Sequence, residues 1–297
     1  MNNVVSHALI VLVLGFGSQA FAQHNSSRGV TTREKDAELQ QLGGVSAFLA
    51  PQCFTNGSGD GFVQVCITER GNISRFESPQ GVVHITGREG YLLTSYVETG
   101  DPDHPQRVVH GFDAGTAEAG WTVPIVSQPN GAGTLPLIVN RTSMDGAMQL
   151  TQTFTLNVAE RGVDITMDVK NLSSVAHVLV TLDRYFDGDM NGSAGGDIYD
   201  QSRVAVWGHE KAIPNGASFE TLALSGAPSS SVFYFVGVET FADWNPNGSK
   251  FQTARGNAGP IQPTPTVAGD LVGRLVIAMT TLAPGQTKST TVRYRRF

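Results

Sequence analysis

Apolar and polar residues alternate along most of the chain from about residue 45 to the C-terminus. Residues 148–158 show the alternation clearly, with threonine, glutamine and asparagine on one side and large apolar residues on the other. The apolar side carries Met148, Leu150, Phe154, Leu156 and Val158. A period of two places successive side chains on opposite faces of an extended chain, so this segment predicts a β-strand with one buried face.

The alternation recurs in residues 162–171, and the "AERG" between the two segments predicts a hairpin turn in which Gly162 supplies a positive φ. The same pattern predicts strands at residues 62–67, 82–87, 91–97, 107–112, 137–142, 176–186, 203–207, 231–238, 273–280 and 289–297. No amphipathic helix of useful length interrupts them. Many short strands separated by turn signals predict an all-β fold, a large antiparallel two-sheet sandwich, formed by residues 45–297 as a single domain.

The N-terminus has the pattern of a secretory signal peptide. An apolar run at residues 8–16 is followed by "AFA" at residues 20–22, which predicts cleavage after Ala22. The run is shorter than the ~20 residues that a membrane-spanning helix needs, and no later stretch is apolar enough. Residues 23–44 form a polar leader with a short helix predicted at 32–42. We therefore expect a secreted or periplasmic protein.

The two cysteines, Cys53 and Cys66, flank "FTNGSGDGFVQV", whose centre is rich in glycine, asparagine and aspartate. Such a centre turns sharply and brings the two flanking strands together. In an oxidising compartment the pair is predicted to form a disulfide. The spacing matches no zinc or redox motif.

Composition narrows the classes of partner. The chain has 297 residues, 15% of them charged, and a formal net charge of -6. A mildly acidic chain without basic clusters argues against a nucleic-acid partner and against anionic membranes. The one dense basic stretch, "RYRRF" at the C-terminus, alternates in a way that predicts an exposed strand face.

Two strand segments resemble the galactose mutarotase-like β-sandwich (supersandwich) group. They are "RGVDITMDVKNLSSVAHVLVTLDRYFD" at residues 161–187 and "TLAPGQTKSTTVRYRRF" at residues 281–297. The resemblance implies a supersandwich fold. The enzymes of that group carry a catalytic histidine near the aromatic pair, whereas this sequence has Arg184 beside Tyr185 and Phe186. An arginine stays protonated and is no general acid, so the resemblance supports the architecture more than the activity.

The segment "RYFDGDMNGSAGGDIYD", residues 184–200, contains a candidate calcium loop. Its "DGDMNG" fits the first half of a calcium-binding motif in which alternating oxygen ligands converge and a glycine permits the turn. The predicted ligands are Asp187, Asp189, Asn191, Ser193 and Asp197, with Asp200 as a further carboxylate. The position of the usual bidentate glutamate holds Ile198, so a structural Ca²⁺ site between strands is predicted rather than an EF-hand. The alternative is an acidic turn that needs no ion, with Arg184 and Arg203 balancing the charge.

Two further clusters are candidates for binding. Residues 239–268 form a long connection rich in glycine, proline and asparagine, with Phe241, Trp244 and Phe251 interspersed. Long connections of this kind are often functional, and we expect these aromatic rings to bind a ligand; the alternative is that they cap the core. The other cluster, Asp101, Asp103, His104 and His110, lacks metal-ligand spacing and predicts a polar loop that leads into a strand.

Two hypotheses follow. The first is a non-catalytic secreted sandwich, stabilised by calcium, that binds glycan or another extracellular surface through its long loop. The alternative is a carbohydrate-active enzyme of mutarotase-like or lyase type that uses Glu89, Asp183 or Glu239. Such an enzyme needs a concave sheet face with a carboxylate and a second proton-transfer group a few ångströms apart.

Overall fold

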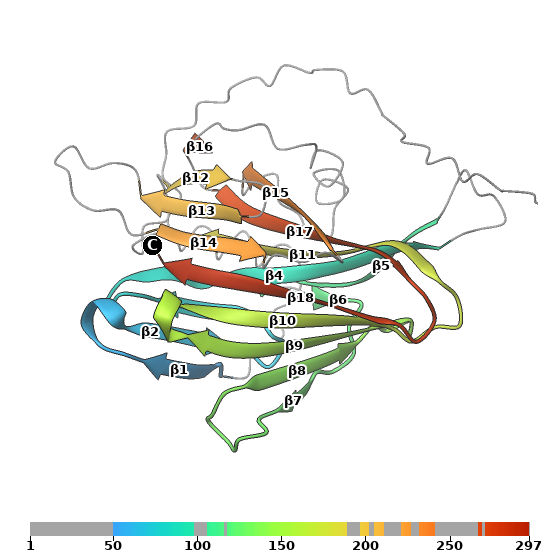
Figure 1. Ribbon diagram of the computed structural model, residues 1–297, viewed down its shortest axis with the longest axis horizontal. Helices are drawn as coiled ribbons and strands as arrows, with labels where there is room; N and C mark the ends of the chain where they lie inside the picture. The colour runs from blue at the N-terminus through green and yellow to red at the C-terminus, as the bar shows by residue number, and fades with distance from the viewer. Residues whose placement is uncertain are drawn as a thin grey trace, which may run out of the picture.

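Two antiparallel β-sheets make up the part of the chain that the computed structural model describes (Figure 1). That part comprises residues 50–97, 106–115, 118–188, 197–201, 205–210, 221–226, 232–240, 267–268 and 271–296. Its helical elements are two three-residue 3₁₀ turns, η1 (Gly59–Gly61) and η2 (Val158–Glu160). The predicted all-β sandwich is confirmed. The signal peptide and the leader lie outside the described residues, and the domain boundaries stay a prediction.

The first sheet follows the order β1-β2-β3-β4-β11-β17-β15, and β5 pairs with β4 and β6. Its strands are β1 (Gln52–Asn56), β2 (Val63–Ile67), β3 (Ile73–Glu77), β4 (Val83–Val97), β5 (Gln106–Asp113), β6 (Glu118–Ala119), β11 (His177–Gly188), β15 (Phe233–Thr240) and β17 (Leu271–Leu282). Two segments predicted as separate strands, 82–87 and 91–97, belong to the one long strand β4. Its first part pairs with β3 and its second part with β5.

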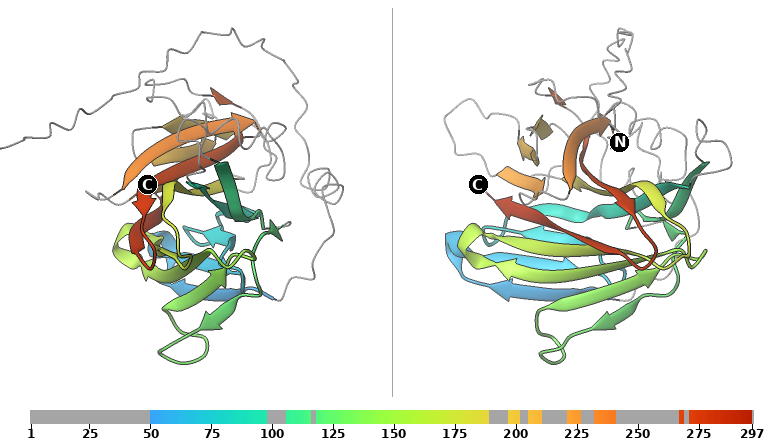
Figure 2. Two further views of the ribbon diagram at one scale, coloured as in Figure 1. Left: turned by 90° about the vertical axis from the view of Figure 1, so that its right-hand side faces the viewer. Right: turned by 45° about the vertical axis from the view of Figure 1, so that its right-hand side comes forward.

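The second sheet follows the order β16-β12-β13-β14-β18-β10-β9-β8-β7. Its strands are β7 (Ile125–Ser127), β8 (Leu137–Thr142), β9 (Met148–Asn157), β10 (Gly162–Asn171), β12 (Asp197–Gln201), β13 (Ala205–Glu210), β14 (Thr221–Gly226), β16 (Val267–Ala268) and β18 (Thr287–Arg296). The last strand of the chain, β18, lies in the middle between β14 and β10 (Figure 1). Figure 2 shows the two layers from the side.

The core fills the space between the sheets. The first sheet contributes Leu93, Leu182 and Ile277, and the second contributes Leu150 and Phe154. All five side chains are fully buried. These residues occupy the apolar phase of the alternation, which is why the strands can be identified from the sequence. Strand β11 is buried on both faces over most of its length, and a second apolar cluster around Tyr185 covers the opposite, outer face of the first sheet.

The predicted disulfide is present. Cys53 and Cys66 stand opposite each other in the register of β1 and β2, and the bond closes a sequence separation of 13 residues. The bond therefore links the edge strand β1 to β2, as the sequence predicted. No helix among the described residues is long and apolar enough to cross a membrane.

The turn between β9 and β10 differs from the prediction. Arg161, and not Gly162, adopts the left-handed conformation, with φ 51° and ψ 48°. Gly162 is already paired in β10, where an added Cβ would lie 2.1 Å from the carbonyl oxygen of Tyr294. The glycine is therefore required by the close approach of β18 and not by turn conformation.

The C-terminal basic strand is not an exposed face as predicted. Arg293 and Arg295 are half-buried, whereas Tyr294 and Arg296 point inward and are buried. The guanidinium of Arg296 donates to the carbonyl oxygen and to Oδ1 of Asp60, at 2.6 Å and 2.7 Å. This contact ties the end of the chain to the turn inside the disulfide loop.

Candidate functional site

The predicted calcium ligands begin at the end of β11. Asp187 is a buried residue of that strand, at 4% exposure, and Asp197 is the first residue of β12. Asp189, Asn191 and Ser193 lie outside the described residues, as do the side chains of Asp197 and Asp200. Within the described residues, no group of three or more His, Cys, Asp or Glu side chains is placed to hold a metal ion. The calcium site therefore stays a prediction.

The predicted aromatic ligand residues, Phe241, Trp244 and Phe251, lie outside the described residues, but the strand that precedes them is described. Strand β15 ends at Thr240, and Glu239 pairs in register with Val272 of β17. On the other side of β17, the same Val272 pairs with Asp187 of β11. Asp187 and Glu239 thus stand on one row of the first sheet, two strands apart, which is about 10 Å at the usual strand spacing.

The strands that precede the two candidate segments therefore end on the same side of the first sheet. The acidic segment follows β11 and the aromatic segment follows β15, and both strands flank β17. Strand β12, which follows the acidic segment, contacts both β15 and β17 (Figure 1). The topology thus places the ends of β11 and β15 on the two sides of β17.

Glu89, one of the carboxylates considered for catalysis, lies between the sheets and is 0% exposed. Its Oε2 accepts from the backbone N–H of Ile73 at 2.7 Å and from Nη2 of Arg184 at 2.8 Å. Its Oε1 accepts from the hydroxyl of Tyr294 at 2.7 Å and from Nε of Arg184. All these partners donate, so the group is bound as an ionised carboxylate.

Arg184 completes this buried network. Besides Glu89, its guanidinium donates to the carbonyl oxygen of Gly71 at 3.1 Å and to the side-chain oxygen of Gln152. Burial raises the pKa of Glu89, and the charge of Arg184 opposes that rise; the carboxylate in turn raises the pKa of Arg184. Arg184 thus holds a carboxylate in the core and, as a guanidinium that stays protonated, does not transfer protons.

Asp183, the second carboxylate considered for catalysis, belongs to the opposite face of β11. It pairs with Arg274 of β17, with Nη2 to Oδ2 at 2.6 Å. Both side chains are buried, and Oδ1 of Asp183 has no hydrogen-bond partner in the part of the chain that the structure describes. The third carboxylate, Glu239, is described only in its backbone.

A second buried ionic network was missed by the sequence analysis. Arg141 of β8 donates to Oδ2 of Asp113 at 2.8 Å and to Oε2 of Glu118 at 2.6 Å. Asp113 also accepts from Nδ2 of Asn72 at 2.6 Å and from the backbone of Gly115 at 2.9 Å. Burial raises the pKa of Asp113 to about 6, against the lowering effect of Arg141. The sequence contained one signal that Arg141 is buried: it follows Leu137 and Val139 on the apolar side of the alternation in β8.

The histidine cluster is divided by the structure. Asp101, Asp103 and His104 lie outside the described residues, whereas His110 belongs to β5 and is buried. It bonds to Asp145 and Ser95 and not to a neighbouring residue of its own segment.

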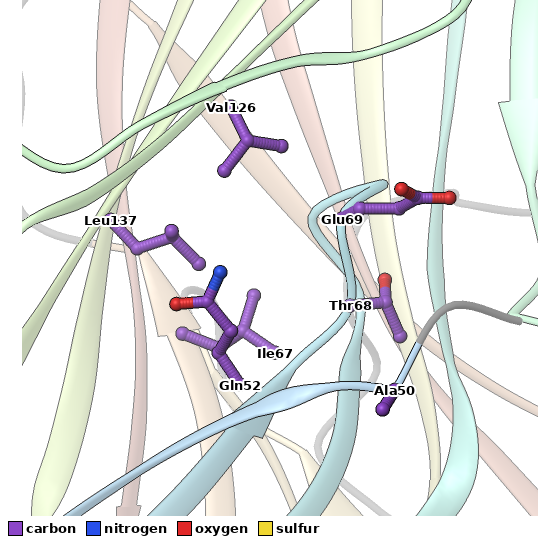
Figure 3. A pocket seen from close by; sticks show the side chains of 7 residues that line it. All are labelled: Ala50, Gln52, Ile67, Thr68, Glu69, Val126 and Leu137. Atoms are coloured by element: carbon purple, nitrogen blue, oxygen red, sulfur yellow. The ribbon is translucent and has the colours of Figure 1, made fainter. Parts of the chain in front are cut away.

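Two cavities lie beside β1, the edge strand of the first sheet, and near β7 and β8 at the edge of the second sheet. The smaller, about 260 Å³, has Val126 and Leu137 of the second sheet on one side and Thr68 and Glu69 on the other (Figure 3). The larger, about 620 Å³, lies beside residues 53–56 of β1. The wall of the smaller cavity is largely apolar and that of the larger is mixed, and the residues that line them provide no pair of adjacent proton-transfer groups.

No family model matches the chain, and no curated protein sequence matches it. Solved structures are similar to it. A bacterial glucoamylase complexed with acarbose matches with a TM-score of 0.53 at 10% identity, over 85% of this chain and 33% of that chain. A putative aldose 1-epimerase from Escherichia coli K12 matches with a TM-score of 0.38 at 13% identity, over 84% of this chain and 99% of that chain. A polysaccharide lyase matches with a TM-score of 0.34 at 11% identity, over 84% of this chain and 33% of that chain.

The glucoamylase match is a likeness of fold, and it agrees with the large β-sandwich that the sequence predicts. This chain spans about a third of the length of the glucoamylase.

Proposed function

We propose that this protein is a secreted β-sandwich protein that binds a glycan without transforming it, at the end of the first sheet where β11, β17 and β15 meet. The observation that carries the proposal is the register row Asp187–Val272–Glu239. In that row, the ends of β11 and β15, which lead into the acidic segment and the aromatic segment, flank the same residue of β17. Aromatic faces with a few polar groups beside them are the usual lining of a ligand site.

Three further observations support the proposal. The Cys53–Cys66 disulfide fits an oxidising, extracytoplasmic compartment. The solved structure with the highest score quoted above is a glucoamylase bound to acarbose, a carbohydrate-active protein. Glu89 is bound to Arg184 inside the core, where it has no access to a substrate. Calcium bound to the acidic segment would order the end of β11 beside the ligand face.

One observation favours a second function, that of a carbohydrate-active enzyme. Asp183 lies on the outer face of the first sheet, and among the described residues its Oδ1 has no hydrogen-bond partner. An oxygen of that kind can accept a hydrogen bond or a proton from a substrate hydroxyl. Against this function, the side chain of Asp183 is buried, and Arg274 donates to its other oxygen.

A glycan array with and without millimolar calcium, followed by assays of the bound glycan for cleavage and anomeric inversion, tests both functions. We expect wild-type protein to bind a glycan and leave it unchanged. Trp244→Ala should abolish binding at an unchanged melting temperature, and Trp244→Phe should retain part of it because a ring remains. Ile125→Ala, at a 70% exposed position of β7, is the matched control and should bind normally.

Three results contradict the proposal. If wild-type protein binds no glycan, the proposed ligand class is wrong. If Trp244→Ala unfolds, the tryptophan belongs to the core. If the glycan is transformed and Asp183→Asn abolishes that activity while the protein stays folded, the enzymatic function replaces the binding function.

A further inference from the structure

A chain of hydrogen-bonded side chains crosses one end of the sandwich between the two sheets. It begins at Asp145, whose Oδ2 lies 3.0 Å from Nδ1 of His110. Nε2 of His110 lies 2.8 Å from Oγ of Ser95, which lies 2.8 Å from Nδ1 of His177. Nε2 of His177 lies 3.1 Å from Oγ of Ser173. The two rings are 5.1 Å apart, edge to face.

The chain is buried in its middle and reaches the surface at its ends. His110, Ser95 and His177 are at most 3% exposed, whereas the side chain of Asp145 is 43% exposed and Ser173 is half-buried. The three buried residues come from β5, β4 and β11 of the first sheet, and Asp145 from the turn between β8 and β9 of the second. The chain therefore joins the sheets and has two ends that can exchange protons with solvent.

With both rings neutral, all hydrogen bonds point toward Asp145. The carboxylate accepts from Nδ1–H of His110, so Nε2 of that ring is an acceptor for the hydroxyl of Ser95. The oxygen of Ser95 then accepts from Nδ1–H of His177, and Nε2 of His177 accepts from the hydroxyl of Ser173. Every polar group along the chain has a partner in this arrangement.

One added proton can be held by reversing the chain. If His110 carries it, Nε2–H donates to the oxygen of Ser95, and the hydroxyl of Ser95 turns to donate to Nδ1 of His177. His177 then donates from Nε2–H to Ser173, whose hydroxyl donates to Oδ1 of Asn171 at 2.8 Å. The charged ring stays paired with Asp145, so again every group is satisfied.

A second proton cannot be accommodated. With both rings charged, Ser95 receives two N–H donors, and its own hydroxyl hydrogen has no acceptor left in the chain. Only one carboxylate balances two positive rings 5.1 Å apart. Burial lowers the pKa of both rings; Asp145 opposes this at both, and His177 adds to it at His110.

The neighbouring strands carry other titratable or charged groups. Tyr96 of β4 and Arg107 of β5 are close to the chain in sequence, and Lys170 of β10 and Lys288 of β18 lie on adjacent strands of the second sheet. The ammonium of Lys288 donates to the carbonyl of Met279 at 2.6 Å and to the hydroxyl of Thr280 at 2.7 Å. The segment that follows β4, residues 98–105, lies outside the described residues.

We propose that the Asp145–His110–Ser95–His177–Ser173 chain holds a single added proton. Because it cannot hold a second, it keeps this end of the sandwich closed at neutral pH and releases it in acid, and we call it an acid-sensitive latch. Both histidines titrate in the unfolded chain near 6.5, so the stability from the neutral rings is present above that pH. This stability decreases as the pH falls from there toward the lower pKa values that the two rings have in the folded protein. In acid the turn at Asp145 separates from β5 and β11.

The order Asp145–His110–Ser95 is also that of a nucleophilic triad, but the geometry favours the latch. The hydroxyl of Ser95 is 0% exposed and is bonded on both sides by imidazole rings. A nucleophile must reach its substrate, and this oxygen is enclosed.

The experiment is an NMR titration of the imidazole nitrogens in the intact protein between pH 8 and pH 4, beside thermal unfolding over the same range. We expect one of the two rings, His110, to become protonated while the protein is folded, and His177 only as it unfolds. In Asp145→Asn the folded protein should lose that protonation, and unfolding in acid should begin at a higher pH. Asp168→Asn, which changes an exposed carboxylate bonded to Ser289, is the matched control and should behave as wild type.

His177→Gln separates the latch from a merely structural role. Glutamine can donate and accept in the place of the ring but cannot become charged, so this variant should unfold at a lower pH than wild type. If both rings titrate independently near 6.5 in the folded protein, or if His177→Gln does not improve stability in acid relative to neutral pH, the latch is overturned.

Discussion

Arg184 of β11 and Glu89 of β4 form an ion pair that is buried between the two sheets, although 95 residues separate them in the chain. Glu89 is one of the carboxylates considered for catalysis, and Arg184 is its buried counter-ion. Each removes the other from proton chemistry, because the guanidinium keeps the carboxylate ionised and the carboxylate occupies its donors.

Removing one member of this pair should cost much of the protein's stability. Arg184→Met leaves the carboxylate of Glu89 buried without its counter-charge, and the loss of such a partner costs about 3–5 kcal/mol. The free energy of unfolding in urea measures it. Glu89→Leu combined with Arg184→Met removes both charges and should cost less than either single change.

A pair nearer the surface serves as the control. Arg75, whose side chain is 43% exposed, pairs with Glu77 at 2.6 Å. Arg75→Met should cost less than about 1 kcal/mol, because solvent screens a pair of this kind. Equal effects of the two arginine substitutions would show that the buried network contributes no more than a surface pair.

The disulfide should stabilise the protein through its closed loop. Replacing Cys53 and Cys66 together by alanine should lower the free energy of unfolding by about 3 kcal/mol on the loop-entropy model. Urea unfolding of the variant and of the reduced wild-type protein should agree. Labelling of both thiols in the native, unreduced protein would contradict the bond.

Arg161 and Gly162 should respond in opposite directions to substitution. Gly162→Ala places a Cβ against the carbonyl oxygen of Tyr294, and relieving such overlap costs about 1–3 kcal/mol. Arg161→Gly relieves a left-handed conformation and should be neutral or stabilising by up to about 1 kcal/mol, although it removes an exposed pair with Asp60. Melting temperatures of the two variants check the signs, and a tolerated Gly162→Ala would contradict the close approach of β18.

Calcium should raise the melting temperature if the acidic segment binds it. An excess of 100 times the dissociation constant adds about 2.7 kcal/mol, or about 5–11 °C for a protein of this size. Asp189→Ala should abolish the shift between EDTA and millimolar calcium. Asp189 is a better probe than Asp187, because Asp187 is buried in β11 and its loss would disturb the strand itself. Unfolding that is indifferent to calcium would mean that the segment is a turn without an ion.

The burial of polar residues could be predicted in part from their position in the alternation of apolar and polar residues. Gln152 falls between Leu150 and Phe154, and Arg184 between Leu182 and Phe186, on the apolar side of the alternation. A polar residue in that phase must enter the core with its strand. The phase predicts burial but not the partner.

The sequence by itself determined the strands, the sandwich class and the disulfide, because each depends on a short stretch of chain. Alternation reports which face of a strand is buried, and the turn between Cys53 and Cys66 places the two cysteines opposite each other. The prediction for residues 158–162 was wrong, because the constraint on Gly162 comes from β18, which is distant in sequence.

Tertiary structure decided which residues meet. Tyr294 reaches Glu89 across 205 residues, and Ser95 bonds to His177 across 82. The strands that precede the two candidate binding segments end on the same side of the first sheet because β17 inserts between β11 and β15, an order that no local pattern encodes. Strand order depends on how both buried faces pack at once, so the identity of each polar partner is a property of the whole fold.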